Sequence, residues 1–171
     1  MRIIFKILIL FAFAVPAHLF AQVGLSLGTE YGFGGFLRAG SYPVMIEAGG
    51  GFAPTIVYIN VLYGEDIFKV YFPATAGAKI SFAVTDKENP NRLGIKGGIS
   101  YNALLGVGFG AGGDYEVSHS PTVIISFSLM YFPDAKKKII EQINKDDGTH
   151  YTESQLTLLP LFPVINLSIV F

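Results

Sequence analysis

Bulky apolar residues alternate with small or polar residues through most of this 171-residue chain. The clearest instance is the segment 164–171, whose bulky positions are Ile165, Leu167, Ile169 and Phe171. Successive side chains of a β-strand point to opposite faces, so a period of two indicates strands rather than helices. An apolar face that includes the carboxy-terminal residue is typical of a strand that faces lipid, because the ends of soluble domains are usually polar and frayed.

The same alternation recurs in six further segments. They are 23–33, 44–52, 76–85, 93–102, 105–112 and 122–131. In the first of them, Tyr31 and Phe33 share the apolar face of Val23, and Glu30 faces the other way. One bulky face and one small, hydroxylated or singly charged face are expected where lipid-facing and lumen-facing positions alternate in a barrel.

The composition agrees with a membrane location. Hydrophobic residues make up 51% of the chain and charged residues 15%, whereas a typical soluble domain has about 25% charged residues. Beyond residue 21 no apolar run is long enough for a spanning helix, and only helices and closed barrels satisfy every backbone group in lipid. We therefore predict an all-β fold, an antiparallel up-and-down transmembrane β-barrel.

No basic stretch is interleaved with aromatic residues, so we expect no nucleic-acid partner.

The pattern leaves two strand numbers open. If both ends of the chain lie on the same side of the membrane, the number of strands must be even. Eight strands of about 10 residues fit into residues 22–171, and ten strands are the alternative. The stretch 55–63 is apolar on both faces. The stretch 67–72 keeps the phase of the segment after Pro73, which indicates either one long strand or a hairpin bent at the proline.

Polar stretches mark the connections, at 42–43, 86–91 and 112–121, and the longest runs from 133 to about 154. In this last one we expect Asp134 to cap a short helix in which Ile139 and Ile143 lie one turn apart and which Gly148 ends. The loop would lie at the cell surface. Its basic run is predicted to contact lipopolysaccharide phosphates or an external partner, with a solvated helix face as the alternative. The run consists of Lys136, Lys137 and Lys138.

Residues 1–21 have the pattern of a secretory signal. Arg2 and Lys6 precede a short apolar stretch, and small residues follow at Ala17 and Ala21. We expect export through the Sec pathway and cleavage after Ala21, with Ala17 as the alternative. The domain prediction is therefore a signal peptide at 1–21 and a barrel domain at 22–171.

Five charged residues fall on the predicted inner faces. They are Glu30, Arg38, Glu47, Lys79 and Lys96. The interior of an eight-stranded barrel is just wide enough to be filled by side chains, so we expect opposite charges to pair there and plug the lumen. A narrow ion path is the alternative.

Other motifs are better explained structurally. Gly108, Gly110 and Gly113 match G-x-G-x-x-G, but they lie in an alternating strand rather than at the start of a helix. Asp114, Ser118, His119 and Ser120 are typical of an exposed loop. Two histidines beyond the signal and no cysteine argue against a transition-metal site. We predict no catalytic, cofactor-binding or metal-binding residue and no enzyme activity.

In its signal, its glycine-rich alternating strands and its last strand, the chain resembles small bacterial outer-membrane proteins of the outer membrane protein beta-barrel domain type. The resemblance covers residues 22–171 in pattern. It implies an outer-membrane location, contact with lipid, and recognition of the last strand by the barrel assembly machinery. The residues concerned are Ile165, Leu167, Ile169 and Phe171.

We expect a monomer with a structural or surface-interaction role. Three alternatives stay open at this point: a small porin-like channel for ions or small solutes, a lipid-modifying barrel enzyme, and a soluble ligand-binding barrel.

Overall fold

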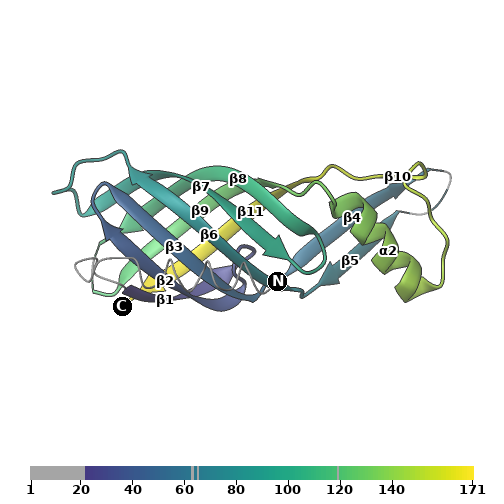
Figure 1. Ribbon diagram of the computed structural model, residues 1–171, viewed down its shortest axis with the longest axis horizontal. Helices are drawn as coiled ribbons and strands as arrows, with labels where there is room; N and C mark the ends of the chain where they lie inside the picture. The colour runs from purple at the N-terminus through teal and green to yellow at the C-terminus, as the bar shows by residue number, and fades with distance from the viewer. Residues whose placement is uncertain (1–21, 63, 65, 119) are drawn as a thin grey trace, which may run out of the picture.

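A computed structural model describes residues 22–62, 64, 66–118 and 120–171, so the predicted signal segment lies outside the described residues. Eight strands form the main sheet. They are β1 Gln22–Gly28, β2 Phe33–Ser41, β3 Val44–Phe52, β6 Ala74–Ala83, β7 Asn91–Asn102, β8 Gly106–Val117, β9 Thr122–Tyr131 and β11 Leu161–Val170. They close into an antiparallel barrel in the order β1-β11-β9-β8-β7-β6-β3-β2 (Figure 1). The predicted eight-stranded antiparallel barrel is confirmed, and the ten-stranded alternative is wrong.

The remaining elements project from one end of the barrel and are called the extension (Figure 1). They are β4 Thr55–Val61, β5 Ile67–Tyr71, α2 Ala135–Asp147 and β10 Leu156–Thr157. The strands β10-β4-β5 form a separate three-stranded sheet. β3 leads into β4, and β5 leads into β6 past Pro73, whose carbonyl oxygen accepts a 3.1 Å hydrogen bond from the Ala53 N–H. The chain at Pro73 is therefore neither one continuous strand nor a hairpin. β5 and β6 follow one another, but β5 pairs with β4 and β6 pairs with β3.

Side-chain burial in the barrel is the reverse of that in a soluble protein. The outer wall exposes large apolar side chains, such as Ile99 at 63% and Ile165 at 60%, whereas Lys79 and Lys96 inside the barrel are exposed by only 6% and 5%. Alternate positions along each strand account for this arrangement, because the closed sheet directs one set inward and the other outward.

The core of the extension accounts for one of the two apolar faces of the stretch 55–63. Val57 and Ile59 of β4 are fully buried together with Ile139 and Ile143 of α2. The other face of β4 is exposed, with Ile56 among its residues. The same apolar cluster continues to the mouth of the barrel. It includes Leu104, Leu105, Met130, Phe132 and Val164.

Helix α2 largely follows the prediction. Ile139 and Ile143 lie one turn apart as expected and are both buried, and Gly148 ends the helix in the left-handed conformation at φ 65°. The predicted cap is wrong, because the Asp134 side chain makes no capping hydrogen bond. Within the described ranges, no helix is long and apolar enough to span a membrane.

Two contacts fasten the end of α2 to β5. Lys69 pairs with Asp147, and the Tyr71 hydroxyl donates a 3.0 Å hydrogen bond to Asp146. Burial and the neighbouring Asp146 carboxylate together raise the pKa of Tyr71 to about 12. The hydroxyl is therefore protonated, and remains a donor, at any physiological pH.

The turn 29–32 between β1 and β2 departs from the sequence prediction. Tyr31 was expected on the outward face with Val23, but it is buried inside the barrel and stacks on Phe36 at 6.1 Å between ring centroids. The alternation stops because β1 ends at Gly28. Gly32 has φ 62°, and a Cβ there would lie 1.7 Å from the Phe52 carbonyl oxygen, so the turn requires glycine.

Candidate functional site

The five charged residues predicted for the lumen all lie inside the barrel, four of them in one group and Arg38 in another. Arg38, Glu47 and Lys79 lie directly opposite one another on β2, β3 and β6. Lys96 follows on β7, and Glu30 reaches inward from the turn 29–32. The alternation placed the four strand residues correctly, because the direction of a side chain depends only on its position along its strand.

At the centre lies a group that we call the lumen network. Its members are Glu30, Glu47, Lys79, Lys96 and Asp114. Lys79 Nζ lies 2.8 Å from Glu47 Oε1 and 3.2 Å from Glu30 Oε2. Lys96 Nζ lies 3.3 Å from both Glu30 Oε2 and Asp114 Oδ1. Each ammonium group therefore bridges two carboxylates.

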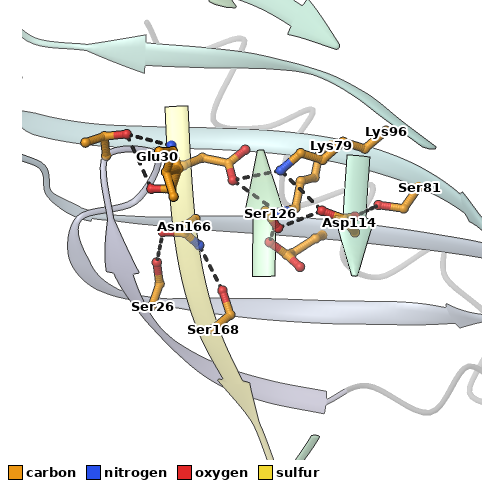
Figure 2. Close-up of polar contacts among 12 residues, drawn as sticks. Ser26, Glu30, Lys79, Ser81, Lys96, Asp114, Ser126, Asn166 and Ser168 are labelled. Atoms are coloured by element: carbon orange, nitrogen blue, oxygen red, sulfur yellow. Dashed lines mark hydrogen bonds and ion pairs between the residues drawn. The ribbon is translucent and has the colours of Figure 1, made fainter. Parts of the chain in front are cut away.

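Hydrogen bonds complete the surroundings of Asp114, as Figure 2 shows. Ser81 donates to one of its oxygens at 2.8 Å and Ser126 to the other at 2.6 Å. A buried carboxylate is stable only when its oxygens are paired, and here each oxygen has at least one polar partner. Asp114 is thus anchored to strands β6, β7 and β9.

A second group, the rim cluster, consists of Arg38, Arg92 and Glu116. Arg38 Nη2 lies 2.6 Å from Glu116 Oε2, and Arg92 Nη1 lies 3.4 Å from Glu116 Oε1. Ser118 donates a 3.0 Å hydrogen bond to Glu116 Oε1. Together the two groups contain four basic and four acidic side chains, so the charges inside the barrel balance.

An uncharged layer lies beside the network, next to β1 and β11 (Figure 2). The Ser26 hydroxyl donates to Asn166 Oδ1 at 2.8 Å, and Asn166 Nδ2 donates to Ser168 at 2.8 Å. All three side chains are buried. This polar layer connects the first and last strands of the closed barrel through side chains as well as through the backbone ladder.

Sequence reasoning missed Asp114, Glu116 and Arg92 as lumen residues. The stretch 112–121 was interpreted as a turn because it is polar, but β8 continues to Val117. The missed signal was the alternation itself. Asp114 and Glu116 keep the inward phase of Gly106 to Gly112, and Arg92 keeps that of Lys96.

Free space inside the barrel is divided. A cavity of about 150 Å³ lies at the end that carries the extension, and one of about 40 Å³ lies beside the rim cluster. Between them, around Glu30, Lys79 and Lys96, lies a hollow of about 10 Å³, which is room for one water molecule at most. The side chains of the lumen network therefore fill the centre of the barrel.

The glycine motif lies within a strand. Gly108 and Gly110 belong to β8, and added Cβ atoms there would lie 2.6 Å from the Phe132 ring and 2.2 Å from the Leu129 carbonyl oxygen. These glycines allow the sheet to curve and side chains to pack against its backbone. Over the described part of the chain, no group of three or more metal-ligating side chains occurs. His119 lies outside the described residues.

The two predicted contact regions lie on the outside. Lys136, Lys137 and Lys138 occupy the first turn of α2, with Lys137 exposed and the other two partly buried. Ile165, Leu167 and Ile169 project from the outer wall on β11, and the Phe171 N–H donates to the Val23 carbonyl oxygen at 3.0 Å.

In comparisons with protein-family models, with curated proteins and with solved structures, no match to this chain was found.

Proposed function

We propose that this chain is a bacterial outer-membrane β-barrel protein with a structural or surface-interaction role, a plugged lumen and no enzyme activity. The observation that carries the proposal is the reversed burial: large apolar side chains cover the outside of the closed sheet, and lysines and carboxylates fill its inside. Exposed apolar surface on this scale is unfavourable in water, but it is the surface that a barrel presents to hydrocarbon.

The orientation follows from the same proposal. The extension projects from the end of the barrel opposite Phe171 (Figure 1). Outer-membrane barrels carry short turns on the periplasmic side and longer loops outside. We therefore place the extension at the cell surface and propose that residues 1–21 direct export and that the last strand is recognised by the barrel assembly machinery.

A plugged lumen predicts electrical silence. Purified protein inserted into a planar bilayer should give no stepwise conductance, because the central free space of about 10 Å³ holds one water molecule at most. Insertion is checked separately, by a folded band in detergent gels that shifts only after boiling. Regular conductance steps from inserted protein would favour the porin-like alternative instead.

The start of α2 supports a contact with phosphate groups. Lys136, Lys137 and Lys138 lie in the first turn of α2, and the Lys138 side chain lies beside Gly106 at the start of β8, near the expected level of the lipid headgroups. Each lysine near an anionic membrane surface contributes about 1 kcal/mol. The triple change to glutamine should therefore reduce the lipopolysaccharide that copurifies with the barrel in mild detergent, and added salt should weaken the wild-type contact. Lys87→Gln, in the loop at the opposite end, is the control; equal losses in both variants would contradict the contact.

A further inference from the structure

At the end of the barrel that carries the extension, the described strands leave part of β11 paired on one side only. The ladder between β1 and β11 ends at Gly28 and Asn166, although β11 continues to Leu161 along β9. Thr29 makes the last contacts across this seam: its N–H donates to the Ile165 carbonyl oxygen at 2.8 Å, and its hydroxyl accepts from the Ile165 N–H at 3.0 Å. For residues 161–164, the described strands provide a ladder partner on the β9 side only.

Pro163 lies on this unpaired edge. In an antiparallel sheet, the backbone N–H and C=O groups of every second residue point toward the same neighbouring strand. The groups of Ile165 point toward β1, so those of residue 163 point to the same side. Proline has no N–H to donate, and it is a residue that proteins place on unpaired edges to prevent a further strand from pairing. The seam is therefore suited to stay open rather than to accept a strand.

Two hollows meet at the seam. Outside the barrel lies an apolar groove of about 650 Å³. Its walls include Leu27, Phe33, Phe52, Phe72, Ile125 and Ile165. Inside lies the cavity of about 150 Å³, whose lining is mostly apolar and also includes the polar residues Glu30, Thr55, Thr75, Ser100 and Asn102. Thr29 and Pro54 line both hollows, so groove and cavity adjoin at these two residues.

We infer that the seam binds a single-chain lipid, with its acyl chain in the outer groove and a small, uncharged, hydroxyl-bearing headgroup in the inner cavity. A monoacylglycerol has this chemistry. The inference rests on the proposed membrane location, because a groove on the outer wall can be filled from the hydrocarbon only if that wall faces lipid.

The size of the cavity limits the headgroup. At about 150 Å³ it is as large as a cavity of about 150 Å³ that binds a molecule of the size of benzene. A glycerol-sized group is of that order, whereas a lipid A disaccharide or a phosphate ester carrying a second chain is much larger. The volume therefore favours a simple lipid over the bulk lipids of the outer leaflet.

The electrostatics of the cavity limit the headgroup's charge. Among the described residues that line it, Glu30 is the only charged one. Its carboxylate is already paired with Lys79 and Lys96 in the lumen network. An anionic head would find no free cation there, and a cationic head would add positive charge to a balanced group. The hydroxyl groups of a neutral headgroup can donate hydrogen bonds to Glu30 and can form hydrogen bonds with the side chains of Thr55, Thr75, Ser100 and Asn102. They leave the net charge of the cavity unchanged.

Photo-crosslinking tests the inference on the unmodified protein. The probe is a monoacylglycerol with a diazirine on its glycerol, mixed at low fraction into phosphatidylethanolamine vesicles that contain the inserted barrel. Peptide mapping should locate the label at the cavity, on Thr55, Ser100 or Asn102. An excess of unlabelled monoacylglycerol should remove this labelling, and equal amounts of the matching fatty acid or of phosphatidylethanolamine should not. Labelling confined to the outer wall, or equal competition by all three lipids, would overturn the inference.

A cavity-filling variant with a matched control makes the test sharper. Ser100→Phe should fill the cavity from β7 and lower the headgroup labelling by about tenfold, which corresponds to about 1.4 kcal/mol. Ile99→Phe adds a ring to the next residue, which faces outward, and should leave the labelling unchanged. Equal labelling in both variants would also overturn the inference. Boiling-dependent gel migration confirms that each variant is folded and inserted; a protein that never inserts would contradict the proposed function rather than the lipid site.

Discussion

Replacing Lys79 with methionine is expected to lower the free energy of unfolding by about 3–5 kcal/mol, the usual cost of removing one partner from a buried ion pair. Lys79 is buried and lies within 3.2 Å of both Glu47 and Glu30. Without it Glu47 loses its ammonium partner inside the barrel, whereas Glu30 keeps Lys96. Urea unfolding of the barrel in vesicles, followed by the fraction that migrates as the folded band, measures the change.

Two further variants decide whether the lost partner causes this effect. Lys137→Met alters an exposed lysine on α2 and should change the stability by no more than about 0.5 kcal/mol. In the Lys79→Met background, Glu47→Gln removes the unpaired charge and should recover part of the loss. A loss below about 1 kcal/mol for Lys79→Met, which is typical of an exposed pair, would contradict a dry, paired lumen.

Phe127→Arg is expected to destabilise the inserted barrel by about 2–4 kcal/mol, the cost of an arginine that faces lipid near the bilayer midplane. Phe127 lies in the middle of β9 and projects outward with 55% of its surface exposed. The same unfolding assay in vesicles measures the effect.

The matched control is Phe68→Arg. Phe68 is also an exposed phenylalanine on a strand, at 65%, but it belongs to β5 in the extension. Outside the bilayer an added arginine should cost no more than about 0.5 kcal/mol. Equal, small effects at both positions would indicate that the barrel wall is surrounded by water.

The features that follow from alternation alone were predictable from the sequence. The inward direction of Lys79 and the outward direction of Ile165 are set by position along a strand, whatever the strand's neighbours are. The same rule, extended past Gly112, places Asp114 inside. It was not extended because acidic residues usually mark turns, and their place in β8 depends on Lys96 and Arg38 from other strands.

Features that depend on tertiary contacts were not predictable. β4 has a strand-like sequence, but its departure from the barrel wall depends on the packing of Val57 and Ile59 against α2, more than 75 residues away in the chain. The inward position of Tyr31 depends on where the turn 29–32 lies. The open seam likewise results from the different lengths of β1 and β11, which a local pattern does not reveal.

The central claim is that the outer wall of this barrel touches hydrocarbon, and accessibility of spin labels tests it most directly. The chain contains no cysteine, so single cysteines along β11 can each carry a nitroxide in vesicles without background. Labels at 165, 167 and 169 should collide readily with dissolved oxygen and be shielded from a water-soluble nickel chelate, whereas labels at 166 and 168 should be shielded from both. If the chelate reaches 165, 167 and 169 as freely as it reaches a label at 137 on α2, the wall faces water and the account is wrong.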